Sequence, residues 1–384
     1  MRADLSYQVR ILESVTEAAE FFMQLKLVQP FLKFEFWQAL EQAQAVGASG
    51  GWKIAHVLLE HQGQPVAFMP LFIKSHHRGE YVFDHSWADA YARHGLDYYP
   101  RLVSSLPFTP VTGQRILMVE GYSLAQVWPF IFQAVQDVAI QYYASSWHAL
   151  FIDEALLRFF QVDSPDLAIR YHCQFLWTNQ GYQHFDDFLA ALTAKKRKSI
   201  KVERQKIAQQ GIEIQRIEGL AINQGDIDFF YQCYSNTYDV RGQRPYLNQA
   251  FFSQLIHEMP QHIMLVVAKR NDQPIAAALF FKDEHTLYGR YWGALEQVDC
   301  LHFEVCYYQG VDYAITNKLQ NFDPGTQGEH KLIRGFAPVY TYSAHWLGRP
   351  EFMEAVQAFC QKEKHYVDEY YQAALASTPF KQTA

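Results

Sequence analysis

The chain has 384 residues, of which 49% are hydrophobic and 19% charged, so it can bury a large core and is not a disordered protein. Its 33 basic and 40 acidic residues give a net charge of −7, which argues against a dedicated nucleic-acid binder. The five cysteines show no CxxC spacing, and His76-His77 is an isolated pair, so neither a disulfide framework nor a metal site is expected. The opening MRADLSYQVRILESV has no apolar signal region, so we expect a reducing, cytoplasmic location.

Taken in chain order, the sequence contains the same succession of elements twice. Apolar residues at helical spacing predict a helix over 34–44, and a β-hairpin follows in HVLLEHQGQPVAFMPLFIK. The second copy begins with a predicted helix over 249–258 and continues with the hairpin IMLVVAKRNDQPIAAALFFK. Both hairpins turn at Gly, Asn or Asp residues, which tolerate left-handed backbone angles, just before a Gln-Pro pair.

The repeat also predicts a third strand and a second helix in each copy. We expect the strands over 80–87 and 286–294, and the helices over 98–105 and 302–316. Strands in meanders followed by helices indicate a mixed α/β fold, with domains at residues 1–178 and 179–384. A strongly basic helix opens the second domain, and a closing helix is predicted over 350–375.

Several longer strings resemble a known family. They are PFLKFEFWQALE, YVFDHSWADAY, LPFTPVTGQRIL, FDDFLAALTAKKRKSIKVER, LYGRYWGALE, LHFEVCYYQGVDYAI and TQGEHKLIRGFAPV. The chain resembles the tandem-GNAT architecture of the Fem-type peptidoglycan aminoacyltransferases, and resembles even more a FemAB-like family of N-acyltransferases associated with peptidoglycan biosynthesis and recognition. The resemblance implies two tandem GNAT-like domains and transfer of an acyl or aminoacyl group to an amine.

The same resemblance implies a role for one lysine and bears on the donor. Lys331, in the string KLIRGF, matches a Fem lysine near the transfer site and would stabilise the developing oxyanion. GNAT proteins that use acyl-CoA carry a glycine-rich loop before the central helix, which holds the CoA pyrophosphate. Here that stretch is LEQVDCLH, with two acids and no glycine, so an aminoacyl-tRNA or another carrier is favoured over acyl-CoA.

Two further residues are candidates for the catalytic step. His302 and Glu304 open the predicted helix over 302–316, and an acyl transfer to an amine needs a group that removes a proton from the amine. An acid is favoured at a helix N-terminus in any case, so Glu304 is either a general base or a capping residue. His302 is either a catalytic group or simply a polar residue at the helix start.

A larger set is expected to bind the substrate. Arg290, flanked by aromatic residues on one strand, suits an anionic or carbonyl ligand, or else pairs with an acid inside an aromatic core. The glycine-flanked loop over 325–335 mixes base, cation and acid, and is either a ligand loop or a solvated turn with an ion pair. The predicted substrate-binding residues are Tyr288, Arg290, Tyr291, Trp292, Tyr307, Glu329, His330 and Arg334, with Asp84, Trp87 and Asp89 in the first copy.

The basic helix is a candidate for binding a large anion. It carries seven Lys or Arg residues between Lys195 and Lys206. Arg197, Lys198, Lys201 and Arg204 lie within a helical stripe that suits tRNA phosphates or anionic lipid headgroups, although a charge run is often just a solvated helix face.

Three functions remain open from the sequence. The first is an acyl- or aminoacyltransferase acting on an amine of a small molecule, a peptide or a cell-wall precursor. The second is a peptidoglycan- or peptide-binding module of the same fold without turnover, and the third is a membrane-surface protein that uses the basic helix. A cavity that joins Tyr288, Arg290, Glu304 and Lys331 would favour the enzyme.

Overall fold

The computed structural model describes residues 6–47, 50–326 and 328–381, and these residues form two compact units. Unit 1 comprises Phe31–His172 and Tyr340–Glu369, together with the N-terminal segment up to Leu27. Unit 2 comprises Cys173–Val339, together with Val28–Pro30 and the C-terminal segment from Tyr370. The sequence suggested a division between residues 178 and 179; the contacts instead divide the chain after His172 and assign residues 340–369 to unit 1.

Unit 1 is a mixed α/β unit with two runs of strands. The small sheet has the order β1-β3-β4-β7, and a second run has the order β15-β8-β6-β5-β2. The strands are β1 (Tyr7–Leu12), β2 (Trp52–Ile54), β3 (His56–His61), β4 (Gln64–Met69), β5 (Phe72–Lys74), β6 (Arg101–Ser104), β7 (Leu117–Met118), β8 (Ser146–Ile152) and β15 (Ala337–Leu347). The helices are α1 (Ala19–Phe22), α2 (Phe34–Gln42), α3 (His85–Arg93), α4 (Leu124–Gln141), α5 (Glu154–Asp163) and the first part of α12 (Pro350–Ala376).

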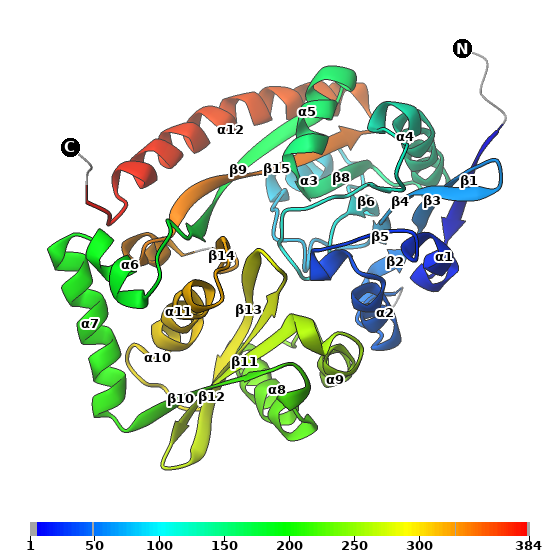
Figure 1. Cartoon of the computed structure of the whole chain (residues 1–384). Coiled ribbons are helices and arrows are strands. Elements are labelled where there is room, and N and C mark those ends of the chain that lie inside the picture. The colour runs from blue at the N-terminus through cyan, green and yellow to red at the C-terminus, as the bar shows by residue number, and fades with distance from the viewer. Residues whose placement is uncertain (1–5, 48–49, 327, 382–384) are drawn as a thin grey trace. The chain divides into compact units, whose positions relative to one another are not determined.

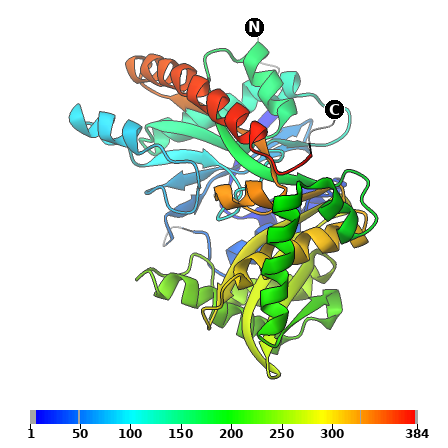
Figure 2. The ribbon, with the colours of Figure 1, turned by 90° about the vertical axis from the view of Figure 1, so that its left-hand side faces the viewer.

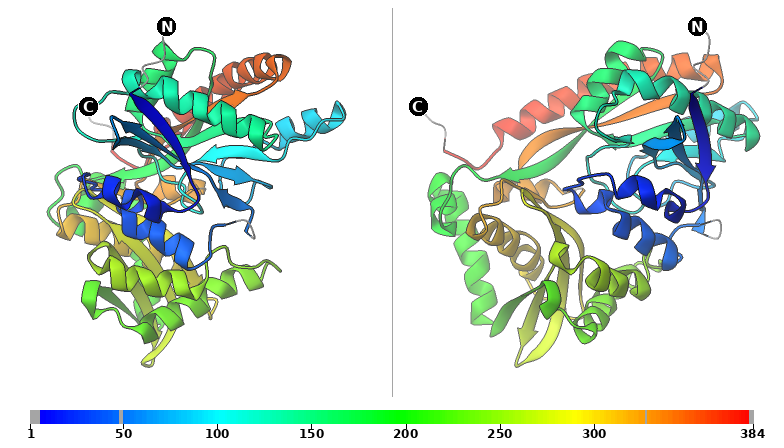
Figure 3. Two further views of the ribbon diagram at one scale, coloured as in Figure 1. Left: turned by 90° about the vertical axis from the view of Figure 1, so that its right-hand side faces the viewer. Right: turned by 45° about the vertical axis from the view of Figure 1, so that its right-hand side comes forward.

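Helix α4 covers the small sheet of unit 1. Its N-terminus is capped by Ser123 and Gln126, and its apolar face, which includes Val127, Ile131 and Val135, is buried. It packs against β1 and β3, as Figure 3 shows, and completes an apolar core with the strands.

Unit 2 is built around the strand order β10-β11-β12-β13-β14-β9. The strands are β9 (Ala168–Thr178), whose first residues belong to unit 1, β10 (Ile212–Glu218), β11 (Ile263–Arg270), β12 (Gln273–Lys282), β13 (Thr286–Ala294) and β14 (Asn321–Asp323). The helices are α6 (Phe185–Ala191), α7 (Ala194–Gln209), α8 (Gln224–Asp239), α9 (Gln249–Glu258), α10 (Leu301–Phe303) and α11 (Gln309–Thr316), with a π-helical turn, η6 (Glu304–Tyr308), and a 3-10 helix, η7 (Glu329–Arg334).

Helix α8 fixes the position of β13 through one glycine. A Cβ atom at Gly293 would overlap the backbone carbonyl of Cys233 in α8, so only glycine allows the helix to lie this close to the strand. Figure 1 shows α8 beside this part of the sheet. On the other side, α7 packs beside β10 and η6 (Figure 2).

The predicted helix and hairpin of each copy are confirmed. Helices α2 and α9, the hairpins β3–β4 and β11–β12, and strand β13 lie where the sequence placed them. The hairpins turn through Gln62-Gly63 and Asn271-Asp272, all four with positive φ, as their turn residues indicated. The closing helix predicted over 350–375 is also present, as α12.

The later part of the first copy was predicted wrongly. The segment 80–87 is not a strand, because α3 begins at His85, and the predicted helix over 98–105 instead contains strand β6. On the edge of β4 away from β3, the pairing strand is the two-residue β7, and the long helix after β7 is α4. In the first copy, residues 72–116 therefore form additional elements, among them β5, α3 and β6.

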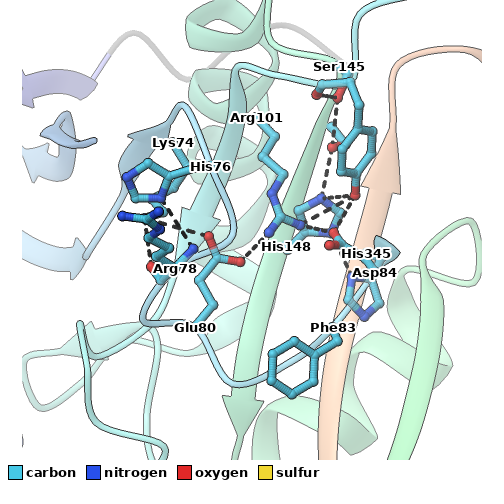
Figure 4. A network of polar contacts seen from close by, with 12 residues as sticks. Lys74, His76, Arg78, Glu80, Phe83, Asp84, Arg101, Ser145, His148 and His345 are labelled. Carbon is cyan, nitrogen blue, oxygen red and sulfur yellow. Dashed lines mark hydrogen bonds and ion pairs between the residues drawn. The ribbon is translucent and has the colours of Figure 1, made fainter. Parts of the chain in front are cut away.

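Polar residues of this segment form a buried network in unit 1, which Figure 4 shows. Arg101 is ion-paired with both Glu80 and Asp84, and all three side chains are almost completely buried. The Tyr98 hydroxyl donates to Asp84, and the Nδ1 atoms of His148 and His345 lie 2.7 Å apart, so they share one proton.

Candidate active site

A cavity of about 380 Å³ in unit 2 opens where β13 and β14 part. The two strands pair in parallel only from Thr286 to Tyr288, opposite Asn321 to Asp323, and β14 ends there while β13 continues to Ala294. The described residues that line the cavity are Ala278, Leu279, Phe280, Gly289, Arg290, Tyr291, Trp292, His302, Cys306, Tyr307, Pro324, Thr326, Gly328, His330 and Lys331.

A shift in strand register shapes the floor of the cavity. The pairing of β12 with β13 slips between Leu279 and Phe280, which is a β-bulge at the lining residues. Strand alternation predicted Tyr291 on the face opposite Arg290 and Trp292, but all three line the cavity. Tyr288 is buried and does not line it; its hydroxyl donates to Asp283 at 2.8 Å.

Lys331 is buried and holds the loop that precedes it. Its Nζ donates to the backbone carbonyls of Gly325 at 2.6 Å and Thr326 at 3.1 Å, and the residue is 1% exposed. Burial lowers the pKa of the Lys331 ammonium to about 8, although Asp323 opposes the shift. An ammonium has three protons, so one remains for a ligand in the cavity.

Three aromatic side chains lie around His302 at the cavity wall. Its ring centroid is 5.3 Å from that of Trp292, 5.1 Å from that of Tyr307 and 6.0 Å from that of His330. Burial, with the nearby positive charges of Lys331 and Arg334, lowers the pKa of His302 to about 4. His302 is therefore neutral near pH 7 and has a nitrogen lone pair that can accept a proton.

The Tyr307 hydroxyl and Nε2 of His330 are 2.8 Å apart, and this hydrogen bond joins the helical segment α10–η6–α11, called the central helix below, to η7. Tyr307 comes from the π-helical turn Glu304–Tyr308, and such turns occur often at functional sites. Gly328 has a φ of +100°, and a Cβ there would overlap the His330 ring. A glycine at this position therefore leaves room for the imidazole.

Glu304 is not among the described residues that line the cavity. Its carboxylate accepts hydrogen bonds from Nε and Nη2 of Arg204, both at 3.1 Å, and from the Gln309 amide at 2.7 Å. The residue is 4% exposed, so the structure places this candidate base in a buried ion pair with α7.

Arg290 and Arg334 are also ion-paired. Arg290 lines the cavity, but its guanidinium contacts both carboxylate oxygens of Asp323, at 2.6 and 3.2 Å. Arg334 does not line it: its guanidinium bonds Glu203 of α7 at 2.9 Å and lies 3.4 Å from the centre of the Phe303 ring. Glu329 accepts from the Tyr370 hydroxyl at 3.1 Å and also lies outside the lining.

The first-copy candidates belong to unit 1 and occupy different environments. Asp84 is buried against Arg101, and Trp87 is buried with its ring centroid 4.8 Å from that of His345. Asp89 is exposed on α3.

The cavity thus brings together seven of the predicted residues, namely His302, Lys331, Arg290, Tyr291, Trp292, Tyr307 and His330. Its described lining contains Arg290 and Lys331 but not Tyr288 or Glu304, so the four-residue cavity that was expected to favour the enzyme is not formed as predicted. Cys306 and Thr326 also line it and were not predicted. Cys306 had a usable signal, since it follows His302 by four residues on one helix. Within the described part of the chain, no group of three His, Cys, Asp or Glu side chains is placed to hold a metal ion.

The basic helix divides into two parts. Towards its C-terminal end, Arg204 is paired with Glu304, and Lys206 with Asp299 at 2.7 Å. Towards its N-terminal end, Lys195, Lys196, Arg197 and Lys198 are exposed or half-buried, and the first turn contains no acidic residue. Lys201, also exposed, lies 4.0 Å from Asp186.

A family model of FemAB-like proteins, described as peptidoglycan biosynthesis and recognition, matches residues 14–382. The chain belongs to the FemAB-like family. No curated protein matches this FemAB-like chain in sequence.

The solved structure of FemX is similar to this FemAB-like chain, with a TM-score of 0.50 at 9% identity over 91% of this chain and 100% of FemX. A tandem GNAT protein from the clavulanic acid pathway has a TM-score of 0.47 at 8% identity, over 90% of this chain and 99% of its own. The L-PGS structure from Bacillus licheniformis has a TM-score of 0.47 at 11% identity, over 86% of this chain and 96% of its own. The match to FemX confirms the predicted mixed α/β, tandem-GNAT fold.

Proposed function

We propose that this FemAB-like chain is a transferase that moves an acyl or aminoacyl group onto an amine in the unit 2 cavity. The proposal rests on one observation: two complementary groups line the same cavity at the open end of β13. They are the buried ammonium of Lys331 and the neutral imidazole of His302. Such a site offers one donor for a developing negative charge and one acceptor for a proton.

In the proposed step, the amine nitrogen of the acceptor attacks the carbonyl carbon of the donor and a C–N bond forms. The carbonyl electrons move to oxygen, where the third proton of Lys331 stabilises the oxyanion. His302 takes the proton that the attacking nitrogen loses. When the oxyanion collapses, the bond to the carrier breaks, and the leaving group receives that proton from His302.

The proposal assigns the base role to His302 rather than to Glu304. The Glu304 carboxylate already accepts three hydrogen bonds and is absent from the described lining, whereas His302 lines the cavity. Glu304 then serves to anchor α7 to the central helix.

For the donor, an aminoacyl-tRNA is favoured over acyl-CoA. The loop before the central helix has no glycine, and its acids are occupied: Glu296 is paired with Arg270, and Asp299 with Lys206. A pyrophosphate there would meet two carboxylates rather than a cradle of backbone N–H groups.

A tRNA or an anionic membrane surface is proposed to contact the N-terminal part of α7. Positive charge surrounds this end of the helix, where the helix dipole adds to it; it comes from Lys195, Lys196, Arg197, Lys198 and Lys201. Arg204, which the sequence included in this stripe, faces Glu304 instead. The proposed acceptor is an amine of a small molecule, a peptide or a cell-wall precursor, and the proposed location is the cytoplasm.

A donor panel tests the proposal. The purified chain is incubated with a radiolabelled acyl-CoA or aminoacyl-tRNA and with a lysine-containing cell-wall precursor peptide, and labelled peptide is measured. We expect transfer from aminoacyl-tRNA. Lys331→Met and His302→Gln should each slow this transfer by about 10²-fold or more, and Lys362→Met, on the exposed surface of α12, should leave it unchanged. If the peptide binds but no donor is consumed, the non-catalytic binding module is the correct reading.

A further inference from the structure

Arg334 joins three elements of unit 2, although it is not among the described residues that line the cavity. The residue is 3% exposed, and its Nε donates to the Tyr308 hydroxyl at 3.0 Å. Nη1 donates to the backbone carbonyl of His330 at 2.8 Å, and Nη2 donates to the two carboxylate oxygens of Glu203 at 3.1 and 2.9 Å. One buried guanidinium therefore connects η6, η7 and α7, and its bonds to α7 are charge-assisted.

Glu203 is the acid that balances this buried charge. Its carboxylate also accepts a hydrogen bond from the Tyr308 hydroxyl, so the contacts of Arg334, Tyr308 and Glu203 close a ring. A buried guanidinium that loses its carboxylate is costly, and its long side chain can then turn towards water. Loss of the Glu203 charge therefore weakens the hold of Arg334 on its other partners.

The bond to the His330 carbonyl bears directly on the cavity. This carbonyl belongs to the peptide unit that joins His330 to Lys331, and both residues line the cavity. The N–H of the same peptide unit donates to the Gly328 carbonyl at 3.1 Å, so both polar groups of this peptide are held. A shift of the peptide plane would move the Cα of Lys331 and, with it, the ammonium that donates to Gly325 and Thr326.

We propose that Glu203 is a positioning residue for Lys331: through Arg334 it fixes the peptide unit that carries the lysine. The inference rests on the proposed function, which gives Lys331 its part in the transfer. Glu203 lies outside the described lining, so it contacts no substrate in this scheme and acts only through its neighbours. Catalysis is sensitive to such placement, because a displacement of about 1 Å can cost about 10²-fold in rate.

Hydrogen exchange measured by mass spectrometry tests the positioning without any transfer assay. In Glu203→Gln, the amides of residues 329–336 should exchange at least about tenfold faster than in wild type, because η7 loses its tie to α7. Residues 263–282, which contain β11 and β12, should keep their exchange rate. Glu213→Gln, at an exposed position on β10, makes the same chemical change and should alter neither segment.

Two exchange results would overturn the proposal. Unchanged exchange over 329–336 in Glu203→Gln would mean that Glu203 does not hold η7. Faster exchange in both segments would assign Glu203 to the general stability of unit 2 instead.

Transfer kinetics test the consequence for the reaction. Glu203→Gln should lower kcat about 10- to 100-fold and leave the KM for aminoacyl-tRNA within about threefold, because the lysine acts in the transition state rather than in binding. The double variant Glu203→Gln, Arg334→Met should be no slower than Arg334→Met alone, since both changes release the same carbonyl. A raised KM with constant kcat, or losses that multiply in the double variant, would contradict the positioning role. If wild type transfers nothing, the proposed function fails, and the exchange experiment still decides whether Glu203 holds η7.

Discussion

Arg204 of the basic helix α7 bonds both carboxylate oxygens of Glu304 at 3.1 Å, from 100 residues away in the chain. The pair joins a residue that the sequence suggested for binding an anion to one that it suggested for catalysis. Each is the other's charge partner, so the proposed mechanism gives neither the role that its residue type favoured. In that proposal the chemistry of the cavity falls to His302 and Lys331.

The first prediction concerns this pair. Glu304→Gln keeps the size and one acceptor of the side chain, so transfer should stay within about threefold of wild type. A true general base would cost about 10²–10⁴ in rate when removed. Arg204→Met should instead destabilise the fold by about 2 kcal/mol, because it leaves the buried carboxylate unpaired. Urea unfolding and transfer rates measure the two effects, and a loss of rate in Glu304→Gln with unchanged stability would return the base role to Glu304.

The second prediction concerns pH. Since burial lowers the pKa of Lys331 to about 8 and the proposed role needs its ammonium form, turnover should fall as the pH rises through about 8. The lowered pKa of His302, about 4, keeps the imidazole neutral well below the ordinary histidine range. After correction for the fraction of neutral acceptor amine, the pH–rate profile should therefore show an alkaline limb near 8 and no acidic limb from His302 between pH 5 and 7. Lys331→Met should lack the alkaline limb; if the limb persists in that variant, another group produces it.

A third prediction follows from the buried histidine pair of unit 1. Burial lowers the pKa of His148 and of His345 well below 6.5, so the folded state does not take up the protons that the unfolded chain binds. Stability should therefore fall as the pH drops below about 6.5, by up to about 1.4 kcal/mol per pH unit for each histidine. Urea unfolding at pH 7, 6 and 5 measures this slope. The double variant His148→Gln, His345→Gln should be less stable at pH 7 but show a flatter slope; an equal slope would assign the acid sensitivity to other groups.

A fourth prediction concerns the contact of α8 with β13. Gly293→Ala forces a methyl group into the backbone of Cys233, so it should destabilise the chain by about 3 kcal/mol or more. Gly348→Ala is the matched control, because its Cβ meets only ordinary contacts, the nearest at 3.5 Å. The free energy of unfolding should change by less than about 1 kcal/mol in the control. Similar losses in both variants would mean that the close approach at Gly293 is not required.

Local patterns predicted elements whose side chains alternate or repeat regularly. Strand β13 was predicted with its bounds as the third strand of the repeat, and Gly, Asn and Asp residues indicated both hairpin turns. The prediction of a strand around Glu80 and Asp84 was wrong because these polar residues are buried against Arg101, and no local sequence pattern reveals such a contact. The two-residue strand β7 is too short to show any alternation.

The site divides in the same way. His302 was predicted from its place at a helix start, His330 from its glycine-flanked loop and Lys331 from the family resemblance, and the cavity joins them. The pairings of Glu304 with Arg204 and of Arg334 with Glu203 depend on how α7 packs, which residue type alone does not specify. Whether a charged residue binds a ligand or a neighbour is decided by such long-range contacts.

In the described part of the chain, no helix is long and apolar enough to cross a membrane. The membrane-surface hypothesis rests on the exposed cations of α7. Reversing the charge at Lys195 and Lys198 should weaken binding to aminoacyl-tRNA, and the salt dependence should become shallower. Binding to anionic liposomes that is lost in the same variant, with tRNA binding unchanged, would favour the membrane instead.

The proposed role of Lys331 is decided by the single-turnover rate of transfer from a saturating aminoacyl-tRNA donor, compared between wild type and Lys331→Met. Since the lysine is proposed to act on the oxyanion, the rate should fall by about 10²–10³. The dissociation constant of the donor should change by less than about threefold, because the lysine acts in the transition state rather than in binding. A rate within twofold of wild type, with the donor bound normally, would contradict the account.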